Sequence, residues 1–174
     1  NLVSQMEHNP YTAHRVWSGP EDQNVRIFLA SDDTELKFRV EVTDDVHVKS
    51  PGAASSFMED GIQLALAVPG QNGHWEFGFA ELEDGSPGTH CWIRPDNLAE
   101  PRTKLAVSAR GRVTIYEIAI PLAGIGAAPE QLKRGIQFNL LVNDNDGEGR
   151  DGWMQIAPGI GEAKNPELYP FILK

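Results

Sequence analysis

A two-residue alternation of apolar and charged side chains is the feature that most constrains how this chain can fold. The alternation is clearest at positions 36–42, where Leu36, Phe38, Val40 and Val42 are separated by Lys37, Arg39 and Glu41. Side chains on a β-strand point alternately to its two faces. The pattern therefore predicts a strand with one buried face and one solvated face.

Similar segments recur along the chain, separated by turns rich in Gly, Asn, Asp and Pro. The further strands that we expect are Val25 to Ala30, Ile62 to Val68, Trp75 to Leu82, His90 to Arg94, Leu105 to Ala109, Val113 to Ile120, Ile136 to Val142 and Gly152 to Ile156. Helices are expected only near Leu2 to Met6 and at Pro129 to Lys133. Many strands with almost no helix predict an all-β fold, an antiparallel β-sandwich of the jelly-roll or immunoglobulin-like kind. The length of 174 residues fits a single domain over positions 1–174.

The balance of charges excludes two classes of partner. Lysine and arginine number 15 and aspartate and glutamate 25, which gives a formal net charge of −10. Such a chain repels nucleic-acid phosphates and anionic lipid, and no apolar run approaches the roughly 20 residues of a membrane span. A neutral glycan or a cation suits this composition better.

The single cysteine, Cys91, excludes an intrachain disulfide and a multi-cysteine zinc site. The sequence begins without Met and without a signal peptide. We therefore expect a piece of a longer bacterial protein, covalently linked to neighbouring domains and located outside the cell or at its surface.

Alternation also divides the side chains of each strand between two faces. Trp75, Phe77 and Phe79 belong to the core, whereas the opposite faces of the strands near 62–68, 75–82, 90–94 and 136–142 mix small residues with planar polar and aromatic ones. Planar polar groups bond sugar hydroxyls, and aromatic rings cover the apolar C–H faces of sugars. This pattern predicts a sugar-binding groove that contains Gln63, Glu76, Trp92, Arg94, Asn139 and Asn143, with Trp153 at its edge. An ordinary solvated sheet face is the alternative.

Several segments, in order, resemble family 9 carbohydrate-binding modules. These segments are Phe38-Arg39-Val40-Glu41-Val42-Thr43-Asp44-Asp45-Val46-His47, Phe57-Met58-Glu59-Asp60-Gly61-Ile62-Gln63-Leu64-Ala65-Leu66, Trp75-Glu76-Phe77-Gly78-Phe79-Ala80, Thr114-Ile115-Tyr116-Glu117-Ile118-Ala119-Ile120-Pro121 and residues 135–147. The resemblance covers residues 25–174. It implies a β-sandwich that binds a glycan and belongs to a larger secreted, polysaccharide-degrading protein.

The resemblance also implies where the sugar lies. Members of the family clamp a terminal sugar between two tryptophans, which fall here at Phe57 and near Ala163, and alanine cannot stack. An acidic binding residue of the family falls at Gln63, and an arginine and an asparagine fall at Gly78 and Ala80. We therefore expect a modified site. In this site Phe57, Trp92 and Trp153 stack, while Gln63, Glu76, Asn139 and Asn143 bond hydroxyls, and Arg94 favours an anionic sugar such as a uronate or a sulfated sugar.

A candidate calcium loop follows the last long apolar segment. Asp144, Asp146 and Glu148, with Gly149, have the D-x-D-x-E-G spacing of hard oxygen ligands on a turning backbone. The twelfth position is Gln155, which excludes a true EF-hand. A turn whose side chains bond their own backbone is the alternative, and the family resemblance favours calcium because members often carry it.

Nothing in the sequence marks an enzyme. A nucleophile elbow, a P-loop and an H-E-x-x-H helix are all missing, so we expect a non-catalytic module. Two other functions stay open. One is a structural spacer without a ligand. The other is a haem-binding electron-transfer sandwich with axial ligands drawn from Met6, Met58, Met154, His47, His74 and His90.

Overall fold

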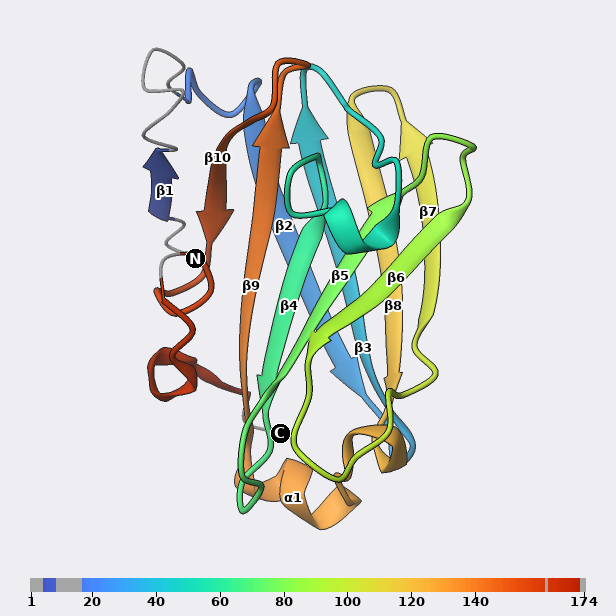
Figure 1. Ribbon diagram of the computed structural model, residues 1–174, viewed down its shortest axis with the longest axis vertical. Coiled ribbons are helices and arrows are strands. Elements are labelled where there is room, and N and C mark those ends of the chain that lie inside the picture. The colour runs from blue at the N-terminus through green and yellow to red at the C-terminus, as the bar shows by residue number, and fades with distance from the viewer. Residues whose placement is uncertain (1–4, 9–16, 162, 173–174) are drawn as a thin grey trace.

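Two antiparallel sheets pack face to face in the computed structural model, which describes residues 5–8, 17–161 and 163–172 (Figure 1). The strands are β1 (Gln5–His8), β2 (Gln23–Ser31), β3 (Glu35–Asp44), β4 (Ile62–Ala67), β5 (Trp75–Glu81), β6 (Pro87–Ile93), β7 (Lys104–Arg110), β8 (Val113–Pro121), β9 (Ile136–Asn145), β10 (Arg150–Gln155) and β11 (Phe171–Ile172). The helical elements are α1 (Pro129–Arg134) and short 3-10 turns at Ala53–Ser55, Ala123–Ile125 and Pro166–Leu168. The predicted antiparallel β-sandwich is confirmed.

The larger sheet has the strand order β1-β10-β9-β4-β5-β6, and β11 also pairs with β9. The smaller sheet has the order β2-β3-β8-β7 and lies behind the larger one in Figure 1. Every strand that alternation predicts is present. The prediction of a helix near Leu2 to Met6 is wrong at residues 5 and 6, because Gln5–His8 forms β1 and pairs with β10. Residues 1–4 lie outside the described part of the chain. No helix in the described ranges is long and apolar enough to cross a membrane.

The main core lies between the two sheets and consists of the residues that alternation assigned to it. Leu36, Phe38, Trp75, Phe77 and Phe79 are all buried there. The rings of Trp75 and Phe77 are stacked with their centroids 5.8 Å apart. The prediction that Trp75 belongs to the core is therefore confirmed.

A second, smaller core covers part of the opposite face of the larger sheet. It contains Ala65, Leu141, Trp153, Ile160 and Tyr169, of which the last two come from the segment after β10. This segment lies directly on Trp153, where a Cβ added at Gly161 would approach the indole Nε1 to 2.5 Å. As a result Trp153 is only 8% exposed. The prediction that Trp153 is an exposed stacking platform at the edge of an open groove is therefore wrong.

Candidate functional site

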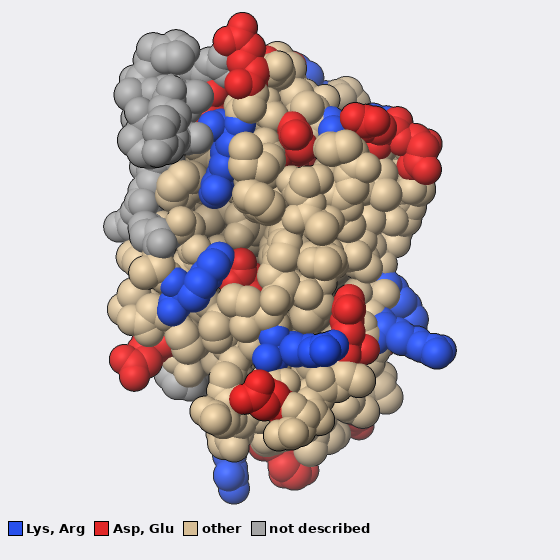
Figure 2. Space-filling model, in the orientation of Figure 1, with Lys and Arg blue, Asp and Glu red and all other residues tan. Residues whose placement is uncertain are grey.

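The part of this face that the second core leaves uncovered forms a pocket of about 250 Å³. Figure 2 shows this side of the molecule, with a hollow that has basic side chains along its left side and acidic atoms inside it. The pocket is lined by Phe57, Gln63, Glu76, Trp92, Ile93, Arg150, Ile160, Gly161 and Lys164. Four of the residues proposed from the sequence, Phe57, Gln63, Glu76 and Trp92, thus lie together.

The floor of the pocket is made by two polar side chains on neighbouring strands. Gln63 of β4 is 4% exposed and Glu76 of β5 is 2% exposed. The Nε2 of Gln63 donates to the Oδ1 of Asn143 at 3.0 Å, and the Nδ2 of Asn143 donates to the carbonyl of Gly61 at 3.0 Å. Asn143 is completely buried. It therefore orients Gln63 from behind instead of lining the pocket, which corrects its expected direct role.

One oxygen of the Glu76 carboxylate is hydrogen-bonded and the other is buried without a partner among the described residues. Its Oε1 accepts a hydrogen bond from Lys164 Nζ at 2.6 Å, and its Oε2 has no hydrogen-bond partner among the described residues. A buried carboxylate is costly unless it is paired and hydrogen-bonded. The lysine meets the first need, whereas the second oxygen is a buried acceptor beneath the surface of the pocket.

The aromatic side of the pocket is a pair of rings from different segments. Phe57 follows the 3-10 turn at Ala53–Ser55 and is 40% exposed, and Trp92 lies on β6. Their centroids are 6.1 Å apart at an interplanar angle of 76°, the edge-to-face geometry that aromatic pairs favour. The indole Nε1 of Trp92 also donates to the Ala54 carbonyl at 3.1 Å. These contacts fix the half-buried indole at the mouth of the pocket.

Gly78 on β5 provides the space for that indole. A Cβ at this position would lie 2.4 Å from Cη2 of Trp92 and 2.6 Å from Oγ of Ser56. No other side chain could replace glycine here without displacing one of them. Gly78, where the resemblance places a binding arginine of the family, is thus required by Trp92.

A β-bulge at Trp92 explains why Arg94 is not part of the pocket. Glu76 pairs with Ile93, but the next residue, Phe77, pairs with Cys91, so Trp92 is an extra residue in β6. An extra residue shifts the alternation that follows it. Ile93 consequently lines the pocket, and Arg94 lies instead in a neighbouring open depression formed by residues 92–99. The expected position of Arg94 is wrong for this reason.

Asn139 is also covered, by the segment that follows β10. Its Nδ2 donates to the carbonyls of Ala157 at 2.6 Å and Pro158 at 3.2 Å, and its Oδ1 accepts the Ala157 N–H at 3.2 Å. Asn139 therefore anchors the segment that carries Ile160, Gly161 and Lys164 to the pocket. Alternation placed Asn139 on the correct face but could not show that another segment covers that face.

Sequence reasoning missed two cations of the pocket, Arg150 and Lys164. The Arg150 guanidinium lies 4.2 Å from the centroid of the Trp153 ring, in the geometry of a cation–π contact. Burial lowers the pKa of Arg150 to about 10. Arg150 begins β10 at an irregularity in its pairing with β9, and Lys164 lies in a loop, so neither belonged to an alternating segment. The position of Lys164 beside Ala163 is the one signal that could have indicated it.

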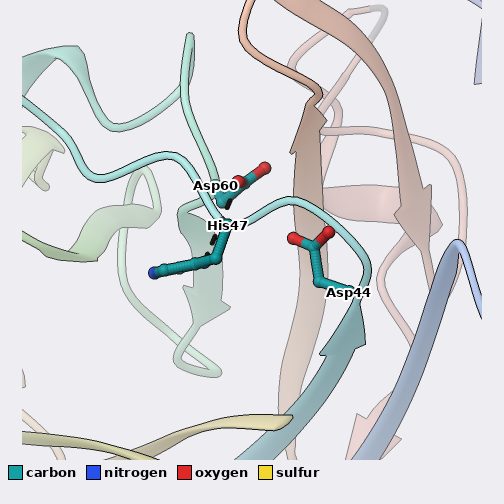
Figure 3. A group of neighbouring side chains, drawn as sticks. All are labelled: Asp44, His47 and Asp60. Atoms are coloured by element: carbon teal, nitrogen blue, oxygen red, sulfur yellow. Dashed lines mark ion pairs between the residues drawn. The ribbon is translucent and has the colours of Figure 1, made fainter. Parts of the chain in front are cut away.

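Acidic side chains collect at one end of the sandwich, in two groups. Ligand atoms of Asp44, His47 and Asp60 lie within 4.8 Å of one another, as do those of Asp22, Asp45 and Asp146. In Figure 3 the Asp44 carboxylate is directed toward Asp60, whereas the His47 ring extends away from Asp44. Of the predicted calcium ligands only Asp146 joins a group, and exposed Glu148 belongs to neither.

The buried carboxylates at this end of the sandwich lie close enough together to disfavour one another's ionised form. Burial first, and neighbouring carboxylates after it, raise the pKa of Asp44 to about 6, of Asp144 to about 7 and of Asp60 to about 9. Asp144 Oδ1 accepts a hydrogen bond from Gln23 Nε2 at 3.0 Å. The buried Asp44 Oδ2 and Gln23 Oε1 have no partner among the described residues. A bound cation would stabilise the ionised carboxylates and would give the two unpartnered oxygens a partner.

The family model described as carbohydrate family 9 binding domain-like matches residues 3–171. The chain belongs to this family. Two solved structures of family 9 carbohydrate-binding modules from Caldicellulosiruptor kristjanssonii are similar to it. The module in complex with glucose is 19% identical with a TM-score of 0.68, and the alignment covers 99% of this chain and 91% of that one. The module in complex with cellotriose is 18% identical with a TM-score of 0.67, over 96% and 86% of the two chains.

No curated protein matches the chain. The family membership confirms the resemblance stated above, and the chain is a carbohydrate-binding module. At these identities the two solved structures show a shared fold, and the binding residues of this module have to be assigned from its own geometry.

Proposed function

We propose that the pocket between Phe57 and Lys164 binds one sugar unit of a glycan, and that the module is non-catalytic. The observation that carries this proposal is the combination of an exposed aromatic pair with buried hydrogen-bonding groups in one hollow. Ligand pockets generally measure roughly 300–1,000 Å³. A pocket of about 250 Å³ lies just below that range, which favours a single sugar unit over a long chain segment.

Each side of the pocket matches one part of a sugar. Phe57 and Trp92 offer ring surface to the apolar C–H groups of the sugar. Gln63, Glu76 and the ammonium of Lys164, which line the pocket, offer acceptors and donors to its hydroxyls. Glucose and cellotriose, which the two similar modules bind, present these same two kinds of surface.

The acidic groups of the pocket support a non-catalytic role. Glycoside hydrolysis ordinarily uses two carboxyl groups about 5–10 Å apart, on either side of the scissile bond. Glu76 is the one acidic residue among the described residues that line the pocket, and Lys164 occupies one of its oxygens. We further propose that the module works outside the cell, within a larger protein that acts on polysaccharide, where binding holds the parent protein on its substrate.

Titration of a glycan panel with fluorescence and calorimetric detection tests this proposal. The panel contains glucose, cellotriose, neutral xylan and mannan fragments, and acidic sugars. Phe57→Ala and Trp92→Ala are expected to abolish binding because each removes half of the aromatic surface. Phe28→Ala is the matched control, since Phe28 is 50% exposed on β2 of the other sheet. If no panel member binds, the spacer role is favoured. If sugar binds but all three variants weaken binding equally, the pocket is not the site.

We also propose that the acidic end of the sandwich binds calcium. The fit is supported by the unpartnered Asp44 Oδ2 and Gln23 Oε1 beside Asp144, since calcium takes several carboxylate and amide oxygens. A ligand that prefers the folded state stabilises it by mass action. The melting temperature should therefore rise with calcium and fall with chelator, and Asp144→Asn should remove most of the difference. A melting temperature that is indifferent to both reagents would exclude this site.

A further inference from the structure

We propose that calcium at the acidic end of the sandwich regulates sugar binding, and that the buried Asn143 is the positioning residue that links the two sites. This inference rests on the proposed function, because it assigns a form of regulation to the same pocket, and on the calcium site proposed with it. A chain of hydrogen bonds between buried side chains joins the two sites. Gln23, Asn143 and Gln63 form this chain, and each is at most 4% exposed.

Gln23 connects Asn143 to the acidic end. Its Nε2 donates to the main-chain carbonyl of Asn143 at 2.9 Å and to Asp144 Oδ1 at 3.0 Å. Its Oε1, which is buried without a partner among the described residues, is one of the oxygens that we assign to calcium. On this assignment one planar amide contacts the ion through its oxygen and β9 through its nitrogen. An ion that fixes the oxygen therefore also fixes the nitrogen.

Asn143 connects Gln23 to the floor of the pocket. Its Nδ2 donates to the carbonyls of Gly61 at 3.0 Å and Ser56 at 3.3 Å. Because a carbonyl can only accept, these two bonds determine which end of the Asn143 amide is the nitrogen. The Oδ1 of Asn143 then accepts from Gln63 Nε2 at 3.0 Å. Gln63 consequently turns its nitrogen toward Asn143 and keeps its Oε1 for a ligand hydroxyl.

Residues 56–61 carry Phe57 and are held by the same end of β9. The Asn145 N–H donates to Asp60 Oδ1 at 2.8 Å. Asp60 in turn belongs to the acidic group, where it has a ligand atom within 4.8 Å of one from Asp44 (Figure 3). One loop therefore extends from the acidic end to the aromatic side of the pocket, and a displacement of its acidic end can displace Phe57.

Repulsion between carboxylates distinguishes the calcium-free protein from the calcium-bound protein. Without a cation, ionised Asp44 and Asp144 repel one another, which favours a larger separation of their side chains. Movement of Asp144 weakens its bond with Gln23 and so loosens the link to Gln63. Bound calcium favours the arrangement in which both Gln23 bonds are made. Calcium and sugar then favour the same arrangement, so each should raise the affinity for the other by the same factor.

Calorimetric titration of sugar in calcium and in chelator tests the inference. The probes are glucose, cellotriose, and neutral xylan and mannan fragments. A sugar that binds should do so about fivefold or more tightly in calcium, because coupling between sites is typically 5–150-fold. Calcium titrated into the sugar-saturated protein should show the same factor. Circular dichroism must show a folded protein in both buffers, since an ion that only stabilises the fold would raise the melting temperature and leave the affinity of the folded protein unchanged.

Three variants locate the link. Gln23→Glu keeps an oxygen for calcium but loses the Nε2 that donates to Asn143, so calcium should still bind and should no longer change the sugar affinity. Asp144→Asn, which removes a calcium ligand, should also make the sugar affinity independent of calcium. Asp33→Asn is the matched control and should keep the full effect, because Asp33 is exposed in the turn at the opposite end of β2 and β3. The comparison of the parent protein in two buffers does not depend on the folding of any variant.

The outcomes separate this inference from the two proposals on which it rests. If sugar binds equally in calcium and in chelator while calorimetry detects bound calcium, both sites stand and the link between them is wrong. If sugar binds but calcium does not, the calcium site and this inference fail and the sugar site stands. If Gln23→Glu keeps the full effect, the link through Asn143 is overturned. If no sugar binds in either buffer, the proposed function fails and this inference fails with it.

Discussion

The substitution Asp44→Asn should stabilise the metal-free protein at neutral pH while leaving it almost unchanged in acid. Asp44 is 3% exposed at the end of β3, and its Oδ1 accepts the Val46 N–H while its Oδ2 lacks a partner in the described part of the chain. Asparagine keeps the shape and the accepting oxygen but removes the charge. The substitution therefore isolates the cost of an ionised carboxylate in this position.

The size of the effect follows from the pKa of Asp44. Burial, together with Asp146 and Asp22, raises it from 3.8 to about 6. A carboxyl with a raised pKa holds more protons in the folded than in the unfolded state between these two values. The free energy of unfolding therefore falls as pH rises through this window. A shift of about two pKa units corresponds to about 3 kcal/mol of stability, present at pH 4 and lost at pH 8.

Urea unfolding in chelator at pH 4 and pH 8 measures this difference. Asp44→Asn should gain up to about 3 kcal/mol over the parent protein at pH 8 and much less at pH 4. Asp96→Asn, at an exposed position of the 92–99 loop, is the control and should show no such difference. The reasoning is refuted if Asp44→Asn changes stability by the same amount at both pH values. With calcium present, the parent protein should be more stable than Asp44→Asn, because the variant loses a calcium ligand that the parent protein keeps.

Three substitutions test the assignment of faces. Trp75→Ala should cost about 3–5 kcal/mol in urea unfolding, as truncation of a buried aromatic does, and a loss below about 1 kcal/mol would contradict its place in the core. Trp92→Ala should abolish sugar binding in fluorescence titration at a smaller cost in stability, because the indole is half-buried; full binding by this variant would remove Trp92 from the site. Gly78→Val should displace the indole and so weaken binding although no ligand-contacting side chain is truncated, and unchanged affinity would contradict the close packing of Gly78 and Trp92.

Alternation predicted the strands and the main core because both depend on local properties of the sequence. Leu36 to Val42 form part of β3, with Leu36, Phe38, Val40 and Val42 buried. The periodicity of a strand fixes which side chains share a face, whatever strands lie beside it. For this reason Gln63 and Glu76 could be placed on one face before their pairing was known, and they form the floor of the pocket.

The same reasoning failed where one residue changes the register. The bulge at Trp92 leaves no clear mark in the sequence, yet it moves Ile93 into the pocket and removes Arg94. It failed again where a distant segment covers a strand. Asn139 and Trp153 lie on the predicted face, but hydrogen bonds and packing with residues 157–161 bury them. Contacts of this kind depend on the path of the chain in space, which periodicity does not encode.

The positions at which the family's binding residues are missing show how the pocket compensates for them. Gly78 lacks the side chain of the family's arginine, and the indole of Trp92 lies in the space that the glycine leaves. Ala163 cannot stack as the family's second tryptophan does, but the adjacent Lys164 reaches Glu76 on the floor of the pocket. On the correspondence that the resemblance implies, an aromatic ring lies where the family has a cation, and a cation lies beside the position of the family's second aromatic ring. The pocket therefore has an aromatic side formed by Phe57 and Trp92 and a polar side formed by Gln63, Glu76 and Lys164.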